Sequence, residues 1–419
     1  MGIRPLAVAL AAVSLSGGVM VAQAAGWTPP APAAGGAAAQ PEDVRAQARA
    51  MAAKAIAYLR KQQDEKSGGW GVPEEGSNRP VFPAITGLVV TGMIANGTVP
   101  VTDPAIVKAQ AFMLKHQQPD GGIYDRVLPS YNTAIVLSAL AKLGTPEARA
   151  AIPAAQDFLR KLQWSEASVA DVGGDEAPRP IDKSHPFYGG VGYGRHGRPD
   201  LSNLSFMLQG LHDSGVPSDD PAFQRALVFL QRVQMYDAVN DMPYADGSKQ
   251  GGFIYSTSVN KDDVGGGQSQ AAGMIEETLD DGTNVSRLRA YGSMTYAGFK
   301  SYIYAGLKKD DLRVLAAKDW ISRHYTLEEN PGAGLDGLYY YLVTFARAME
   351  AWGEPQLEVR LPSGETALRD WRADLVERLS RLQNEDGSFR SVDDRWMEND
   401  PVLITAYALI ALQAAAGGA

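Results

Sequence analysis

The residues of this sequence whose types could do chemistry are tyrosines, amides, one aspartate and one lysine, placed at or near the starts of strongly apolar segments. Tyrosine rings bind apolar groups and cations, whereas amide, carboxylate and amine groups supply hydrogen bonds and charge. We therefore expect these residues to bind a ligand, and we assign a catalytic role to none. The alternative is that the polar ones cap helices and the tyrosines fill the core. The candidates are Tyr131, Asn132, Asp200, Asn203, Tyr296, Lys300, Tyr339 and Tyr340.

Two of the basic residues have unusual surroundings. Lys300 stands inside the otherwise apolar and aromatic segment 296–304. A lysine there must pair with a carboxylate or face a wet cavity, so an ion pair and a ligand contact are both open. Arg198 precedes Asp200 near the start of another apolar segment. It is expected either to pair with Asp200 in a solvated loop or to present a basic group to a ligand.

The composition excludes several kinds of chemistry. The 419 residues include no Cys, so the chain forms no disulfide, thiolate nucleophile or Cys-ligated zinc site. The five His residues show no metal-ligand spacing, and Gly265-Gly266-Gly267 lacks the Lys-Ser/Thr pair of a phosphate-binding loop. We therefore predict no metal and no cofactor. A net charge of −9, from 39 Lys and Arg against 48 Asp and Glu, argues against a nucleic-acid partner.

The N-terminal residues have the pattern of a signal peptide. Arg4 is followed by the apolar stretch Leu6–Leu15 and by Ala22-Gln23-Ala24, a small-x-small cleavage site. We predict a signal peptide over residues 1–25, cut near Ala24 or Ala25, and an Ala/Pro/Gly linker over 26–41. No later segment has the roughly 18 apolar residues of a transmembrane helix. The protein is therefore expected to be exported, into the periplasm or the medium.

From residue 42 to 416 the sequence repeats one unit. Each unit has an amphipathic segment, a Gly-containing turn with an aromatic residue, and a second segment that is apolar nearly all round, such as 133–140. An all-round apolar helix must be covered on every side, so we expect six outer helices around six inner ones. We predict a closed double ring, and a linear stack of the units is the alternative. The amphipathic segments end at Gln63, Gln117, Gln163, Gln234, Tyr325 and Gln383.

Two stretches, Gln117–Gly122 and Gln383–Phe389, carry a Gln followed three residues later by Asp-Gly. They resemble the repeat of squalene/terpenoid cyclases and protein prenyltransferase β-subunits. The resemblance covers about residues 42–416 and implies an all-α fold, an α6/α6 toroid. It also implies cyclase or transferase chemistry on isoprenoid substrates.

The catalytic residues of that family are missing from this sequence. Class II terpenoid cyclases use an Asp-x-Asp-Asp pattern, and none of the acidic pairs here has an Asp two positions before it. The zinc site of protein prenyltransferases includes a Cys, which this chain lacks. The sequence therefore leaves open whether the protein is an enzyme.

Three readings of the function follow. The first is binding of an apolar or isoprenoid-like ligand in a central cavity. The second is a non-catalytic scaffold that binds a protein partner through the loops 165–184 and 255–285. The third is a polysaccharide lyase-like glycan enzyme, which needs a Tyr or Lys base and an Arg or Asn that neutralises a uronate. Candidates for that set are Arg195, Arg198, Asn132 and Tyr296.

Overall fold

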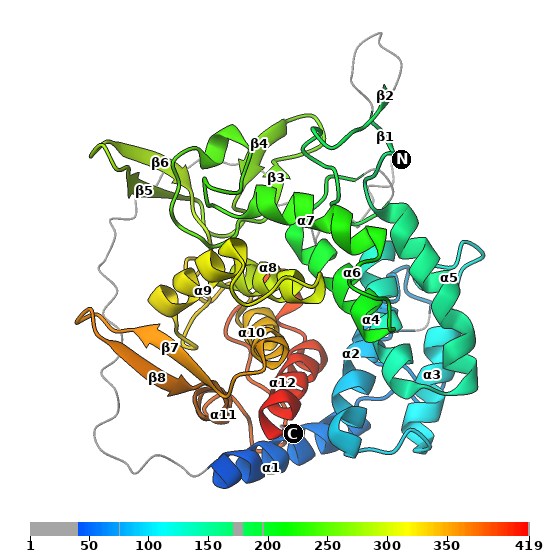
Figure 1. The fold of residues 1–419 in the computed structure, drawn as a ribbon. Coiled ribbons are helices and arrows are strands. Elements are labelled where there is room, and N and C mark those ends of the chain that lie inside the picture. The colour runs from blue at the N-terminus through cyan, green and yellow to red at the C-terminus, as the bar shows by residue number, and fades with distance from the viewer. Residues whose placement is uncertain (1–40, 75, 171–178, 195–196, 418–419) are drawn as a thin grey trace.

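Six outer helices surround six inner helices in the computed structural model, which describes residues 41–74, 76–170, 179–194 and 197–417 (Figure 1). The predicted signal peptide and all of the predicted linker except Pro41 lie outside the described residues. The outer helices are α1 (Pro41–Lys61), α3 (Pro104–Lys115), α5 (Pro146–Leu162), α7 (Pro221–Val233), α9 (Leu312–His324) and α11 (Trp371–Ser380). The inner helices are α2 (Pro83–Ile94), α4 (Pro129–Leu143), α6 (Leu201–Asp213), α8 (Gly292–Tyr304), α10 (Leu338–Trp352) and α12 (Pro401–Ala416).

The inner helices form a closed ring. Each packs against the next in the order α2, α4, α6, α8, α10 and α12, and α12 packs against α2 as well as α10. The first and last outer helices, α1 and α11, also touch each other, and both pack on α12. The predicted all-α toroid is confirmed, and the linear stack is excluded.

Local sequence signals explain where these helices begin and which faces they bury. Asp103, Asp220 and Asp400 each precede a proline and accept a hydrogen bond from a backbone N–H in the first turn, as expected of N-caps. Every residue of α2 is buried, whereas α1 buries only one stripe. This difference is what separates an inner helix from an outer one.

A glutamine at the end of most outer helices joins neighbouring units. Its side-chain amide donates one hydrogen bond to a glycine carbonyl in the following turn and another to a carbonyl of the next outer helix. Gln383 repeats the pattern across the closure, because Nε2 donates to Gly387 O at 3.3 Å and to Met51 O in α1 at 2.9 Å. The other acceptor pairs are Gly68 and Ala105 for Gln63, Gly189 and Ala222 for Gln163, and Gly251 and Arg313 for Gln234.

The turn that follows Gln383 also needs a glycine. Gly387 has φ of 92°, and a Cβ built on it would lie 2.2 Å from the carbonyl oxygen of Lys54 in α1. Both the positive φ and the close approach therefore exclude a side chain at this position. The sixth unit thus touches the first through backbone.

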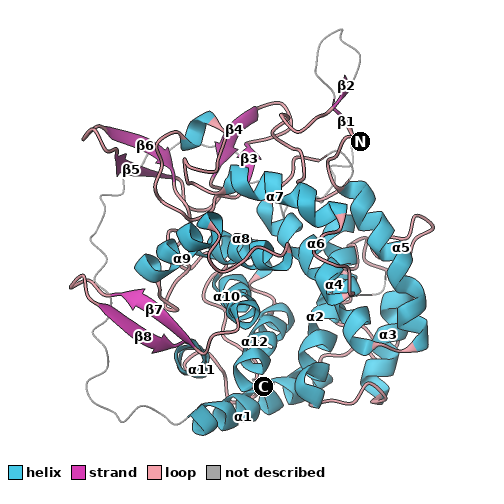
Figure 2. Ribbon diagram, in the orientation of Figure 1, coloured by secondary structure: helices cyan, strands magenta, loops and turns pink. Residues whose placement is uncertain are grey.

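Four two-stranded antiparallel sheets lie in the loops outside the helical ring (Figure 2). The predicted partner loops 165–184 and 255–285 hold six of the strands, although residues 171–178 lie outside the described residues and β6 ends at Leu288. A role of these loops in binding a protein stays a prediction. No helix among the described residues is long and apolar enough to cross a membrane. The strands are β1 (Val169–Ala170), β2 (Arg179–Pro180), β3 (Ser256–Ser258), β4 (Val264–Gln268), β5 (Met274–Thr278), β6 (Asn284–Leu288), β7 (Gln356–Arg360) and β8 (Thr366–Asp370).

The closure can be tested with a pair of glycine substitutions. Gly387→Ala is expected to lower the free energy of unfolding by about 4 kcal/mol, since it combines backbone strain with a clash against α1. Gly364→Ala is the control, because Gly364 has φ of 86° and nothing within 4 Å of a built Cβ. That variant should lose only about 1 kcal/mol from strain. Urea unfolding of both variants makes the comparison, and equal losses would contradict the packed closure.

Candidate functional site

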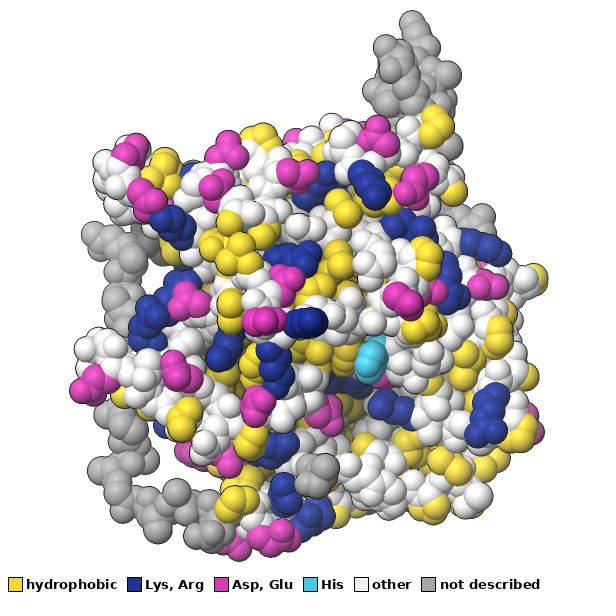
Figure 3. All heavy atoms as spheres, in the orientation of Figure 1, with side chains coloured by type: hydrophobic (Ala, Val, Ile, Leu, Met, Phe, Trp, Pro, Cys, Tyr) yellow, Lys and Arg dark blue, Asp and Glu magenta, His cyan; other side chains and the backbone are white. Residues whose placement is uncertain are grey.

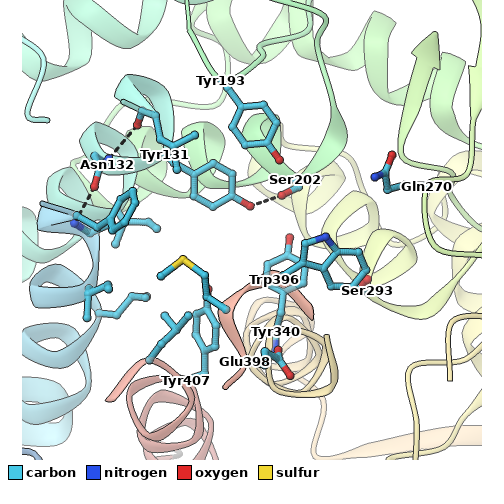
Figure 4. Close-up of a pocket in the computed structure, with 18 of the residues that line it drawn as sticks. Tyr131, Asn132, Tyr193, Ser202, Gln270, Ser293, Tyr340, Trp396, Glu398 and Tyr407 are labelled. Atoms are coloured by element: carbon cyan, nitrogen blue, oxygen red, sulfur yellow. Dashed lines mark hydrogen bonds between the residues drawn. The ribbon is translucent and has the colours of Figure 1, made fainter. Parts of the chain in front are cut away.

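A cavity opens at the end of the ring where the inner helices begin (Figure 4). The space that the centres of water molecules can occupy in it is about 150 Å³, and all of its empty space, including open solvent at the mouth, is about 1140 Å³. All six inner helices contribute to its wall, and the loops beside them complete it. The helical residues are Ala84, Ile85, Leu88, Tyr131, Asn132, Ile135, Ser202, Ser293, Met294, Tyr340, Leu403 and Tyr407. The loop residues are Phe82, Leu128, Tyr193, Arg198, Tyr255, Gln270, Tyr291, Trp396, Met397 and Glu398.

The wall has an aliphatic part and a tyrosine part. The aliphatic side chains come mostly from α2 and from its neighbours α4 and α12, as with Ile85, Leu88 and Leu403. Tyrosines come from the loops before α6 and α8 and from the first turns of α4 and α10, and α12 adds Tyr407. A ligand that fills the cavity would therefore meet hydrocarbon on one side and aromatic rings with hydroxyl groups on the other.

The tyrosines hold one another in place. Tyr131 stacks on Tyr193, with ring centroids 5.8 Å apart and planes 9° apart, and its hydroxyl is hydrogen-bonded to Ser202 Oγ. The hydroxyl groups of Tyr193 and Tyr255 are 2.9 Å apart and share a hydrogen bond. Burial raises the pKa of Tyr193 far above its usual value. These hydroxyls therefore stay protonated and act as neutral donors and acceptors.

Arg198 lines the cavity and does not pair with Asp200. Its Nη1 donates to Val259 O at 2.7 Å, to Ser258 O at 3.3 Å and to the side chain of Gln268. Its guanidinium carbon lies 5.2 Å from the centre of the Tyr255 ring. The expected ion pair is replaced by carbonyls of the β3 segment, because these lie within reach of the guanidinium and fix it beside the tyrosine.

Asp200 and Asn203 lie behind the cavity wall at the start of α6, where Asp200 is the N-cap and Asn203 bonds to its carboxylate. Asp200 accepts hydrogen bonds from the backbone N–H and the side-chain amide of Asn203, both at 2.8 Å. Asn203 Oδ1 in turn accepts one from Ser130 Oγ at 2.8 Å. Burial is the main cause that raises the pKa of Asp200 to about 6. The capping role that the sequence offered as the alternative describes both residues.

Glu398 is a buried carboxyl that the sequence analysis missed. It is 1% exposed and lines the cavity beneath Tyr340 (Figure 4). Its two oxygens accept from the backbone N–H groups of Tyr339 at 3.0 Å and Tyr340 at 2.8 Å. It thus caps α10, whose own N-cap residue is Gly337 and has no side chain. Burial raises the pKa of Glu398 to about 7, although the two hydrogen bonds act in the opposite direction.

Of the remaining predicted residues, Tyr131, Asn132 and Tyr340 line the cavity. The amide of Asn132 is engaged with backbone, because Oδ1 accepts from Ala84 N at 3.0 Å and Nδ2 donates to Val127 O and Leu128 O at 3.1 Å. Asn132 therefore shapes the wall and has little left to offer a ligand.

Tyr296, Tyr339 and Lys300 do not line the cavity. Tyr339 donates its hydroxyl to Arg390 O at 2.6 Å, on the side away from Tyr340. Tyr296 packs edge-on against two aromatic rings of α10, and its buried hydroxyl has no partner among the described residues. Lys300 Nζ donates to Gln209 Oε1 at 2.7 Å, and no carboxylate of the described residues forms the expected ion pair with it.

The cavity also contains aromatic residues that were not among the candidates. Tyr193 and Tyr255 stand at the same place in two turns, Gly189-Gly190-Val191-Gly192-Tyr193 and Gly251-Gly252-Phe253-Ile254-Tyr255. That repeated position is a signal that could have identified them. Trp396 carries no such signal, because it lies in the short 3-10 helix Arg395–Met397 outside the repeat.

Strained backbone gathers around the cavity. Among the described residues, six that are not glycine have positive φ, and four of them line the cavity. Each such residue costs about 1–3 kcal/mol, and strain of this kind collects at functional sites. An ion pair between Arg395 and Asp336 anchors the segment that carries two of them. The four are Leu128 (φ 49°), Gln270 (45°), Trp396 (54°) and Met397 (67°).

Among the residues that the structure describes, no group of three or more His, Asp or Glu side chains is arranged to hold a metal ion. The polar groups that line the cavity are the hydroxyls of tyrosines and serines, the amides of Asn132 and Gln270, the guanidinium of Arg198 and the carboxyl group of Glu398.

Comparison with known proteins shows a shared fold at low sequence identity. No protein-family model matches the chain, and no curated protein matches it in sequence. A D-mannose isomerase is 12% identical with a TM-score of 0.53, over 87% of this chain and 96% of that one. An α-1,6-mannanase from Salegentibacter is 8% identical with a TM-score of 0.52, over 88% and 99%. A type II terpene cyclase from Scytonema is 12% identical with a TM-score of 0.48, over 90% and 99%. The closed double ring of helices is an α/α toroid, and at these identities the likeness to the solved structures extends to the fold alone.

Proposed function

We propose that this protein binds an amphipathic ligand with an apolar, isoprenoid-like body in the cavity where the inner helices begin. The observation that carries the proposal is the wall itself, in which all six inner helices supply side chains and aliphatic residues face tyrosines. Clefts that combine an apolar wall with a few fixed polar groups are typical ligand sites. Export through a signal peptide over residues 1–25 is part of the proposal.

The scaffold reading expects a ring interior that is filled by large side chains. The open cavity argues against it at this end of the ring. Several cavity residues also hold strained backbone conformations, which a purely structural role would not need. Ligand binding therefore accounts for more of the observations.

The glycan-enzyme reading has one observation in its favour. Arg198 lies next to the ring of Tyr255 in the cavity, so an arginine and a tyrosine, two of the residue types that this reading needs, are side by side. The set expected from the sequence is nevertheless dispersed, because Tyr296 is packed elsewhere and Arg195 is outside the described residues. Under our proposal, uronate polymers incubated with the protein give no absorbance of an unsaturated product.

Glu398 is the group of the cavity best suited to donate a proton to a bound ligand. It lines the cavity, and burial keeps its proton on to about pH 7. A buried carboxylic acid of this kind serves as a general acid in several enzyme classes. If the protein turns over an isoprenoid-like ligand in a cyclase- or transferase-like reaction, Glu398 is the residue to which we assign the proton transfer.

Ligand binding can be tested with one cavity variant and one matched control. Farnesol, farnesyl diphosphate and squalene are titrated separately, and binding is followed by tryptophan fluorescence and by mass spectrometry of retained ligand. Tyr131→Ala is expected to weaken binding about tenfold or more, because it removes one aromatic wall. Tyr296→Phe should leave binding unchanged, since Tyr296 is buried outside the cavity and its hydroxyl has no partner. Retention of none of these ligands, or equal binding by both variants, would remove the proposal.

The protonation of Glu398 has a separate signature in stability. Its pKa is about 7 in the folded protein against an ordinary value of 4.5, so the folded state favours the protonated form. Relative to Glu398→Gln, the native protein should therefore lose about 3 kcal/mol of unfolding free energy as the pH rises from 4.5 to 7. Above pH 7 the difference should stay constant. Urea unfolding of both proteins across this range measures the loss. If the unfolding free energies of the two proteins change equally with pH, Glu398 titrates normally.

A further inference from the structure

A layer of polar side chains crosses the inner ring beyond the floor of the cavity. It is formed by the ninth or tenth residue of four consecutive inner helices, namely Ser138 in α4, Gln209 in α6, Lys300 in α8 and Arg347 in α10. The cavity lining reaches only to the seventh residue of an inner helix. The polar layer is therefore separate from the proposed ligand site, and its residues contribute nothing to the cavity wall.

Lys300 is buried in this layer with spare hydrogen-bonding capacity. It is 3% exposed, and an ammonium group has three donors. One donor goes to Gln209 Oε1 at 2.7 Å, and Nζ lies 5.7 Å from the centre of the Tyr304 ring. No carboxylate of the described residues lies within ion-pair distance of Nζ. A buried ammonium with so few partners is unfavourable unless something else compensates its charge.

Arg347 presents a second cation to the same place. It lies on α10, which packs against α8, and is half-buried. It makes no hydrogen bond or ion pair with any residue that the structure describes. Burial and, after it, the charge of Arg347 lower the pKa of Lys300 to about 7. The positive charges of Lys300 and Arg347, on the neighbouring helices α8 and α10, therefore repel each other.

Asp213 offsets only one of the two positive charges, and it forms no ion pair with Lys300 or Arg347 among the described residues. Asp213 favours the charged form of Lys300, yet its carboxylate already accepts from Ser138 Oγ at 2.7 Å and Gln209 Nε2 at 3.1 Å. It also lies 3.5 Å from His212 Nδ1. Lys142 and Glu350 act on the layer from exposed positions and carry opposite charges.

We propose that Lys300 and Arg347 form a binding site for a small oxyanion, a carboxylate or a tetrahedral sulfate- or phosphate-like group. An oxyanion between the two cations would use the free donors of the ammonium and the fork of the guanidinium. The site would be reached from the end of the ring where α12 finishes. Figure 3 shows that face, with Lys and Arg side chains and a histidine around a recess near its middle.

Binding of an anion at this site should depend on pH in a defined direction. The anion favours the charged ammonium, so affinity is greatest below pH 7 and falls as Lys300 loses its proton. Between pH 6 and pH 8 the charged fraction of a group with a pKa of about 7 falls about tenfold, and the affinity should fall with it. His212 lies close to Asp213 beside the same layer, so variants are needed to assign the effect to Lys300.

The test titrates the mature protein with sodium sulfate and with sodium acetate by calorimetry at constant ionic strength, set with chloride. Sulfate keeps its charge between pH 6 and pH 8, which isolates the titration of the protein. We expect the unmodified protein to bind at least one of the two anions at pH 6 and to bind it about tenfold more weakly at pH 8. Sulfate binding assigns a tetrahedral ligand, and acetate binding a carboxylate.

Three variants distinguish binding of an anion at this site from non-specific binding of anions to exposed lysines. Arg347→Met and Lys300→Met should abolish binding, whereas Lys308→Met, which removes an exposed lysine after the same helix, should keep it. If Lys300→Met fails to fold, Arg347→Met suffices, because Arg347 is only half-buried and unbonded. In that variant the pKa of Lys300, measured by nitrogen NMR of labelled lysine, should also rise. Binding of neither anion at pH 6, or equal binding by Arg347→Met and Lys308→Met, would overturn the proposal.

Discussion

The structure depends on one constraint, which is that the inner helices are mostly apolar and are buried on nearly every side. α2 and α12 bury almost their whole surface, so each needs neighbours around its full circumference. A ring of six such helices inside six amphipathic ones meets this need without leaving an apolar end helix exposed. Closure is therefore a consequence of burial, and the last unit repeats against the first the same glutamine and glycine contacts that join some of the other units.

A ring of parallel inner helices has two electrically different ends. The helix starts carry positive partial charge and unpaired N–H groups, and the helix ends carry negative partial charge. The two carboxyl groups and the two basic groups inside the ring are placed in agreement with this polarity. The carboxyls of Asp200 and Glu398 lie at helix starts, where they accept from backbone N–H groups, and Lys300 and Arg347 lie toward the helix ends. The two proposed sites thus use opposite ends of the same dipoles.

At the cavity, the capping of a helix start by a carboxyl group occurs together with strained backbone. Glu398 caps α10 from a distant segment, and the residues just before it, Trp396 and Met397, are held in left-handed conformations. The cap and the strained segment are therefore coupled, since the carboxylate reaches α10 only if the backbone before it takes this path. Such coupling explains why a segment outside the repeat supplies part of the cavity wall.

The sequence by itself determined the two helical layers and the repeat, and the structure decided that the ring closes. The alternation of amphipathic and all-round apolar segments predicted the two layers, the Gln and Asp-Gly turns predicted the repeat, and Asp-Pro pairs marked the helix starts. These features are local, so they can be read along the chain. The sequence predicted only some of the tyrosines that line the cavity. Tyr339 and Tyr340 are adjacent in sequence, and the rotation of α10 decides that Tyr340 faces the cavity.

The tertiary structure decided the partners of the charged groups. Arg198 was expected beside Asp200 and instead binds carbonyls some 60 residues away, and Lys300 meets Gln209 from another helix. Glu398 was not identified at all, because nothing near it in sequence shows that α10 lacks a cap. Long side chains reach whatever the fold brings close, and that proximity is set by the packing of whole helices, which no local pattern encodes.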